Sequence, residues 1–317
     1  MVTVKVITSD SLVWNIGEVV EAISLARHIN SELELDLIDE GPDFETLNLM
    51  QYIKDWDYKT TVHTRNAVQA PVGNIQFVQL SPHFLESTKQ ALQEVTIDKT
   101  IEKPFGCFIG RSNVHRLYLS SYLYRRKLAN QTFHYDSTVE FHKDNLGLDK
   151  LVETYTASSL SDAVWLLENS PVVTAEEVCY PILHNQHNNF YKEYSNFLIE
   201  LVCETYYSGR TFFPTEKTWR PIMLGTPFII QGPQWYLHRL RDLGFQTFDR
   251  WWDEGYSEDP ANHQPHEIVK VIDFLAQKSI NELNAIYTEM QPTLQHNKQR
   301  FLQLTSKDFE IFNNDKY

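Results

Sequence analysis

Residues 195–233 read SNFLIELVCETYYSGRTFFPTEKTWRPIMLGTPFIIQGP, and this stretch decides the fold that the sequence predicts. The apolar runs 197–202 and 227–230 each suit a buried strand. Between them, Thr215 occupies the position of a helix N-cap, directly ahead of the amphipathic run 217–224. A strand, a loop, a helix and a second strand in this order predict a parallel pair, with the loop at the carboxyl ends of the strands. Ligands bind at that edge of open parallel sheets.

The first turn of the predicted helix carries a pair of opposite charges. Glu216 and Lys217 lie beside backbone N–H groups that have no partner within the helix, and these groups and the helix dipole favour an anion. Lys217 adds a full positive charge, whereas the Glu216 carboxylate can accept hydrogen bonds from the hydroxyls of a ribose or a sugar. A nucleotide sugar offers both partners. The alternative interpretation is a pair of solvated charges, because Thr-Glu-Lys is a common helix start.

The helix start belongs to a longer ordered pattern. The segment 213–221 reads FPTEKTWRP, and GTPFII at 225–230 and Gly-Pro at 232–233 follow it. This order resembles the donor-binding segment of the alpha-1,3-fucosyltransferase family. In that family an acidic residue precedes a Thr-Glu-Lys helix start, and a glycine, a proline and a short strand ending in Gly-Pro come after it. Glu204 stands in the place of the acidic residue, but Phe213 stands where a tyrosine–valine pair usually precedes Thr-Glu-Lys.

A second motif lies upstream of the first. Residues 107–113 read CFIGRSN, and Arg116 follows shortly after them. The motif looks like that family's strand ending in Ser-Asn, which is followed by an arginine that holds the donor diphosphate. The resemblance covers about residues 104–248. It implies the GT-B glycosyltransferase architecture, an α/β fold in which two Rossmann-like domains face a cleft, and it implies a reaction that inverts the anomeric centre.

Composition is ordinary for a globular protein and excludes some classes. The chain is 42% hydrophobic and 22% charged, and its 317 residues are long enough for two domains, each with its own core. No apolar run approaches the roughly 18 residues that span a bilayer, and the N-terminus has no signal-peptide pattern.

Cys107, Cys179 and Cys203 are widely spaced and mostly in apolar contexts, so we expect reduced, buried thiols and a cytoplasmic protein. The net charge of −14 disfavours a nucleic-acid partner, although a local basic groove would not appear in this total.

Predicted strands and helices alternate along the chain, which indicates open α/β sheets. We expect strands at residues 3–9, 33–38, 60–64, 75–80, 105–109 and 131–135. We expect helices at residues 16–29, 44–56, 82–94, 114–128, 160–168, 234–243, 267–276 and 280–304.

The polar and charged segment 96–104 predicts a domain boundary. We expect an N-terminal acceptor-side α/β domain at 1–103 and a C-terminal donor-binding α/β domain at 104–278. The remaining segment, 279–317, is a C-terminal helix, and the resemblance implies that it packs back across the domains.

The expected donor-binding residues lie at strand-to-helix turns. A guanidinium can hold a diphosphate through two parallel hydrogen bonds and keeps its charge. Each candidate also has a plainer role: the arginines on a solvated helix face, Ser112 or Asn113 as a helix cap, and Arg220 as an ion-pair partner of Glu216. The predicted donor-binding residues are Arg111, Ser112, Asn113, Arg116, Glu204, Thr215, Glu216, Lys217 and Arg220.

Candidates for the catalytic base lie in the first domain. An inverting transfer needs a carboxylate or imidazole within hydrogen-bond reach of the acceptor hydroxyl. Asp10 and Glu40 follow predicted strands, hence both could face the cleft, and Glu18 lies on the first helical turn after the Asp10 loop. Each of the three could equally be structural, and the sequence does not choose among them.

These observations predict an enzyme, a metal-independent glycosyltransferase that moves a sugar from a nucleotide-diphosphate sugar to an acceptor hydroxyl. Two alternatives stay open: a non-catalytic nucleotide-sugar or glycan-binding module, and a glycosyltransferase acting on modified bases in DNA. His184 and His187 have the spacing of a metal pair, but a third ligand is missing nearby. We therefore predict no metal, and no cofactor besides the nucleotide-sugar donor.

Overall fold

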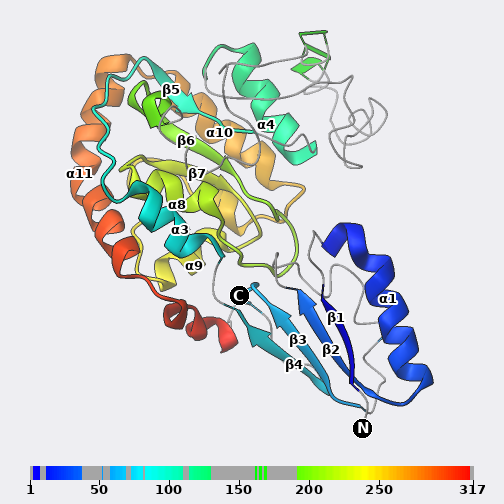
Figure 1. Cartoon of the computed structure of the whole chain (residues 1–317). Coiled ribbons are helices and arrows are strands. Elements are labelled where there is room, and N and C mark those ends of the chain that lie inside the picture. Colours follow the sequence, from blue (N-terminus) through cyan, green and yellow to red (C-terminus); the bar gives the residue numbers. More distant parts are fainter. Residues whose placement is uncertain are drawn as a thin grey trace.

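The computed structural model describes residues 3–7, 12–37, 52, 58–68, 73–80, 83–109, 114–129, 161–162, 164–165, 168–169 and 191–314. Within these ranges the chain forms helices around two small parallel sheets (Figure 1). The predicted mixed α/β class is therefore confirmed. The arrangement of two GT-B domains stays a prediction.

The first sheet has four parallel strands in the order β1-β2-β3-β4. They are β1 (Thr3–Ile7), β2 (Glu32–Leu37), β3 (Thr60–Thr64) and β4 (Ile75–Gln79), and helix α1 (Leu12–His28) packs on β1 and β2. Residues of β3 alternate between buried and half-exposed, as expected of a strand with one face on a core. That small core contains Val19, Ile23, Ala26, Leu33, Leu35, Val62 and Ile75.

The second sheet has three parallel strands in the order β5-β6-β7. These are β5 (Lys103–Gly106), β6 (Phe197–Cys203) and β7 (Phe228–Gln231). All residues of the central strand β6 are buried, as expected of a parallel strand covered on both faces. Gly106 permits close contact of β5 and β6, because a Cβ there would lie 2.5 Å from the Phe197 ring.

Helices of the C-terminal half surround the second sheet (Figure 1). Helix α8 packs on β6, α10 packs on β7, and α11 contacts α8, β5 and β6. The predicted helix over residues 44–56, Tyr52 excepted, and the predicted strand over 131–135 lie outside the described residues. The described helices that follow β5 are α4 (Val114–Arg125), α8 (Glu216–Met223), α9 (Tyr236–Asp242), α10 (Gln264–Ala276) and α11 (Ile280–Gln303), with 3-10 turns η2 (Tyr191–Ser195), η3 (Gly255–Glu258) and η4 (Ser306–Asn314).

Helix α8 begins and ends where the sequence predicts. Thr215 is the N-cap, and its side chain accepts a hydrogen bond from the Lys217 N–H. After the helix, Gly225 adopts φ +61°, and the Thr226 N–H donates to the Pro221 carbonyl at 2.9 Å. This is a Schellman end, which needs a residue that tolerates the left-handed region, hence glycine. The local prediction for this unit is confirmed.

Helix α3 (His83–Leu92) belongs to the larger core, although the predicted boundary puts it in the first domain. It packs against α8, and its residues Leu85 and Leu92 are buried with the second sheet. Lys89 also donates a hydrogen bond from its Nζ to the Leu304 carbonyl at 2.5 Å. The boundary at 103/104 itself stays a prediction.

No helix in the described part of the chain is long and apolar enough to cross a bilayer. Cys107 and Cys203 are buried free thiols, as the sequence predicts, and Cys179 lies outside the described ranges.

Lys99 anchors the segment before β5 to the start of β6. Its Nζ donates hydrogen bonds to the Phe197 carbonyl at 2.9 Å and to Thr226 Oγ1 at 3.0 Å. The ammonium also lies over the Phe197 ring, 4.8 Å from its centroid. Burial lowers the Lys99 pKa to about 7, against the attraction of Glu200.

In the wild type, the free energy of unfolding should rise between about pH 7 and about pH 10, and in Lys99→Met this rise should be smaller. The native state releases the Lys99 proton near pH 7, whereas the unfolded chain keeps it to the ordinary lysine range. In that window the unfolded state binds more protons, so wild-type stability rises with pH. Urea unfolding at several pH values measures the difference. Lys278→Met is the control, because Lys278 also lies over a ring, that of Phe274; equal slopes for all three proteins would contradict the shifted pKa.

Candidate functional site

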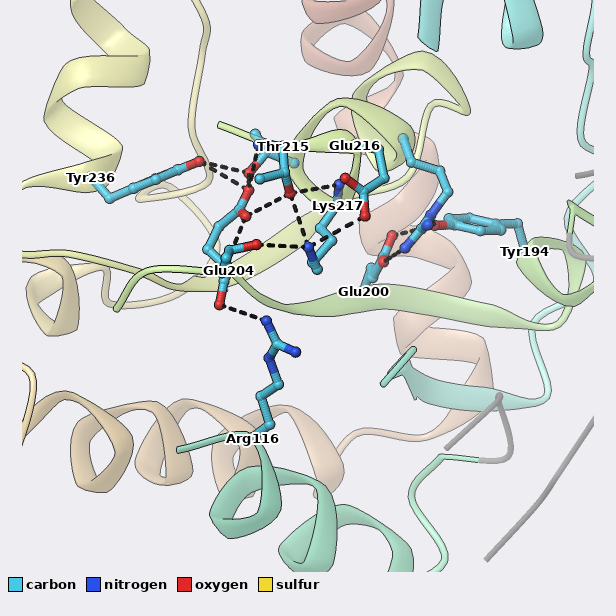
Figure 2. Close-up of polar contacts among 11 residues, drawn as sticks. Arg116, Tyr194, Glu200, Glu204, Thr215, Glu216, Lys217 and Tyr236 are labelled. Atoms are coloured by element: carbon cyan, nitrogen blue, oxygen red, sulfur yellow. Dashed lines mark hydrogen bonds and ion pairs between the residues drawn. The ribbon is translucent and has the colours of Figure 1, made fainter. Parts of the chain in front are cut away.

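The candidate site lies at the carboxyl end of β6, where the chain enters the β6–α8 loop, residues 204–215. Residues from α4, from β6 and from the first turn of α8 meet there (Figure 2). The sequence predicts a ligand site at this edge of the parallel sheet, and the structure brings Arg116, Glu204, Thr215, Glu216 and Lys217 into one region.

Glu204 is the most heavily hydrogen-bonded carboxylate of this region, and it is 1% exposed. Its Oε1 accepts from the Thr215 N–H at 3.1 Å, the Thr218 hydroxyl at 2.6 Å and the Tyr236 hydroxyl at 3.1 Å. Its Oε2 accepts from the Thr215 hydroxyl at 2.7 Å and the Thr205 N–H at 3.2 Å. These bonds place a negative charge at the N-terminus of α8, where the helix dipole stabilises it.

Lys217 and Glu216 occupy the accessible side of the same helix end. Lys217 Nζ donates to Thr205 Oγ1 at 3.1 Å and to Thr215 Oγ1 at 3.2 Å, and it lies 3.3 Å from Glu216 Oε1. The side chains of Lys217 and Glu216 are 18% and 29% exposed. Burial alone would raise the Glu216 pKa, but Lys217 and then Arg220 outweigh it and lower that pKa. Glu216 is therefore an ionised acceptor at neutral pH.

Arg116 reaches the site from α4, on the other side of β6. Its Nη2 donates to the Glu204 carbonyl at 3.2 Å, and the residue is 5% exposed. Because Lys217 bonds the side chain of Thr205, the two cations from distant parts of the sequence contact consecutive residues at the end of β6.

Arg220 points to a different partner from the one that its spacing suggests. Its Nη2 lies 3.1 Å from Glu200 Oε1, and its Nε donates to the Tyr194 hydroxyl at 2.6 Å. The Tyr194 hydroxyl in turn donates to Glu200 Oε2 at 2.5 Å. The Arg220 and Glu200 side chains are 4% and 2% exposed, so this triad lies inside the protein, between β6 and α8. Arg220 thus forms an ion pair with Glu200, and its charge also lowers the Glu216 pKa.

Burial is the main cause of the raised pKa values of Glu200 and Tyr194 in this triad. It raises the pKa of Glu200, although the charge of Arg220 and the hydrogen bond from Tyr194 oppose this rise. Burial also raises the Tyr194 pKa well above its ordinary value, so the phenol stays neutral and donates its proton to Glu200.

Several predicted site residues cannot be placed. Arg111, Ser112, Asn113, Asp10 and Glu40 lie outside the described residues, as do His184 and His187. Glu18 lies on α1, and its side chain is outside what the structure describes. Across the described ranges, no three His, Cys, Asp or Glu residues gather closely enough to hold a metal ion. Ligand contact by any predicted residue stays a prediction.

Sequence interpretation missed four partners of the site. Thr218 and Tyr236 bind Glu204, and Glu200 and Tyr194 bind Arg220. Thr218 could have been found, since it lies one turn after the N-cap Thr215 on the same helix face. The other three come from separate elements, and no local pattern marks them.

The geometry supplies two fixed cations, an ionised carboxylate and a rigid helix start at the carboxyl edge of a parallel sheet. Such a set can bind an anionic group together with a hydroxyl-bearing group. Comparison of the chain with protein-family models, with curated proteins and with solved structures finds no match.

Proposed function

We propose that the chain is a glycosyltransferase of the GT-B type, which moves a sugar from a nucleotide-diphosphate sugar to an acceptor hydroxyl without a metal and with inversion. One observation carries the proposal: Arg116 and Lys217 converge on Glu204 and Thr205 at the carboxyl end of β6. The two motifs that resemble fucosyltransferases are far apart in the sequence, and their cationic residues bond consecutive residues after β6. A shared ligand explains this convergence.

In this function the two cations stabilise the negative charge that builds on the leaving diphosphate, which is the preorganised electrostatic effect found in many active sites. Glu216 accepts hydrogen bonds from the hydroxyls of the ribose or the sugar. The Thr215 N–H already binds Glu204 and the Lys217 N–H already binds Thr215 Oγ1. We therefore assign the diphosphate to the cationic side chains more than to the helix amides.

The meeting of the two sheets also supports the proposal. The segment after β3 in the first sheet hydrogen-bonds to the β6–α8 loop, through Asn66 and Ala67 on one side and Phe212 on the other. The carboxyl end of β3 thus lies against the proposed donor site. Asp10 and Glu40 follow β1 and β2 of the same sheet, of which β2 is the neighbour of β3, and with Glu18 they remain our candidates for the base.

A nucleotide sugar should raise the thermal stability of the wild type but not of Lys217→Ala. Ligand at about 100 times its Kd adds about 2.7 kcal/mol to the native state. The measurement is a thermal-shift panel of UDP-, GDP-, ADP-, CMP- and dTDP-sugars on both proteins. Lys270→Ala is the control, because Lys270 is 72% exposed and pairs only with its helix neighbour Glu267 among the described ion pairs. This control should respond as the wild type does.

Absence of a shift with every nucleotide sugar would contradict the interpretation of Glu216 and Lys217 as donor-binding residues. Slow hydrolysis of the donor without acceptor separates the enzyme from a non-catalytic binding module. Acceptor binding that weakens steeply with salt would instead support a DNA acceptor.

A further inference from the structure

Asn66 joins the first sheet to the β6–α8 loop. It follows β3, and it is 1% exposed. Its Oδ1 accepts hydrogen bonds from the Phe212 N–H at 2.9 Å and the Val68 N–H at 3.0 Å, and its Nδ2 donates to the Arg210 carbonyl at 3.1 Å. Beside these bonds, the Ala67 N–H donates to the Phe212 carbonyl at 3.0 Å. One buried amide thus binds two strand-end segments that are distant in the sequence.

The remaining sides of the loop are held by aromatic side chains. The Phe212 ring packs against Phe309 and Phe312 of η4, with centroids 6.3 Å and 5.0 Å away. The Phe213 ring packs against Phe84 of α3, with centroids 6.3 Å apart. Phe212 is fully buried, so the centre of the loop has one defined position.

The two ends of the loop carry the groups of the candidate site. Thr205 at the start binds Lys217 after the end, at 3.1 Å. Between the ends, residues 206–210 are half-exposed or exposed. Glu204 ties Thr205 to Thr215, and Asn66 fixes the centre of the loop between them, so a displacement of Phe212 would act through the loop on the contacts of the Lys217 ammonium.

We propose that Asn66 is a positioning residue, through which the first sheet sets the geometry of the cation site on the second. The part of this inference that concerns the ligand rests on the proposed function. The part that concerns the loop does not, because every contact in it is within the protein.

Asparagine is the residue type that this position needs. Its amide accepts two backbone N–H groups and donates to one carbonyl at the same time. Alanine leaves the buried Phe212 N–H without its side-chain acceptor, and buried backbone donors are costly to leave unpaired. Aspartate keeps both acceptor bonds, but its second oxygen faces the Arg210 carbonyl and its charge is buried, so it replaces asparagine only in part.

The test compares Asn66→Ala and Asn66→Asp with Asn297→Ala in the full chain. Asn297 is a matched control, since it is 1% exposed and its side chain binds the Gln246 N–H and carbonyl, both at 2.8 Å. We expect amide hydrogen exchange over residues 204–217 to become about tenfold faster in Asn66→Ala. Exchange there should stay unchanged in Asn297→Ala and rise less in Asn66→Asp.

The second readout is the affinity for GDP and UDP, measured by titration where all variants are folded. If only about a tenth of the Asn66→Ala molecules hold the loop correctly, the apparent Kd weakens about tenfold. Asn297→Ala should keep the wild-type Kd, and Asn66→Asp, which keeps the two acceptor bonds, should weaken the affinity less than Asn66→Ala does.

Unchanged exchange over residues 204–217 in Asn66→Ala would overturn the inference. So would faster exchange with an unchanged Kd, because the loop would then not govern the site. If no nucleotide sugar of the thermal-shift panel binds the wild type, the proposed function fails separately, and the exchange result alone decides whether Asn66 holds the loop.

Discussion

Glu204→Gln should lower the free energy of unfolding by about 3 kcal/mol, although it preserves the shape of the side chain. Each carboxylate oxygen of Glu204 accepts a backbone N–H, Oε1 from Thr215 and Oε2 from Thr205. A hydroxyl that donates to an oxygen can rotate and accept a hydrogen bond from an NH₂ group instead, but a backbone N–H can only donate. In glutamine one of the two oxygens is replaced by an NH₂ group, and at either position this donor points at a backbone N–H, which is also a donor. The variant also loses the negative charge that complements the α8 dipole.

Urea unfolding of the variant measures this effect. Glu282→Gln is the matched control, because Glu282 also accepts a backbone N–H at a helix start, that of Ser279, but on the exposed surface of α11. We expect the control to change stability only slightly, since water replaces the lost acceptor. Equal effects of the two substitutions would show that the Glu204 network does not hold α8 in place.

Local sequence patterns predict the β6–α8–β7 unit well because its determinants are local. Thr215 caps the helix with its own side chain, Gly225 supplies the positive φ that the helix end requires, and β6 is apolar at every position except Glu200. Each of these features depends on neighbours within a few residues. The parallel pairing then follows, since a helix between two buried strands returns the chain to the same edge of the sheet.

The side-chain partners of the site are not predictable in the same way. Residues 218–223 of α8 are all buried, and the helical pattern does not say which residue of β6, or of the loop after it, lies opposite each of them. The structure places Glu200 against Arg220 and Glu204 against Thr218. These pairs depend on how far α8 is rotated and shifted over the sheet, which many long-range contacts decide together.

Asn66 is the clearest example of a role without a sequence signal. It lies in a short polar segment after β3, and nothing in its neighbourhood distinguishes it from a turn residue. The role that we propose for it depends on Arg210 and Phe212, in a loop that η4 and α3 also contact. The predicted donor residues share a motif, whereas the residues that hold them come from separate elements.

Arg220→Met should destabilise the protein by about 3–5 kcal/mol at neutral pH. Methionine fills much of the same space, so the main loss is electrostatic. Without the guanidinium, Glu200 is a buried charge left with the Tyr194 hydroxyl and the more distant Lys99, and Tyr194 loses its donor from Arg220. Arg250→Met is the control, because the ion pair of Arg250 with Glu289 is exposed and such pairs contribute about 1 kcal/mol or less.

The pH dependence of Arg220→Met separates a lost charge pair from lost packing. Burial already raises the Glu200 pKa in the wild type, and removal of Arg220 raises it further. Between the unfolded carboxyl range and this raised native pKa, the native state binds more protons than the unfolded chain, so stability falls as pH rises. Arg220→Met should therefore approach the wild type at acidic pH and fall furthest behind it at neutral and alkaline pH.

The double variant Glu200→Gln with Arg220→Met completes the argument. Glutamine keeps an acceptor for the Tyr194 hydroxyl and removes the unpaired charge, so the double variant should be more stable than Arg220→Met alone at neutral pH. It should also lose the pH dependence described above. A double variant as unstable as Arg220→Met, with the same slope against pH, would mean that packing around α8 and not the Glu200 charge determines the need for Arg220. The expected recovery would instead assign Arg220 to neutralising a buried carboxylate under the helix that carries Lys217.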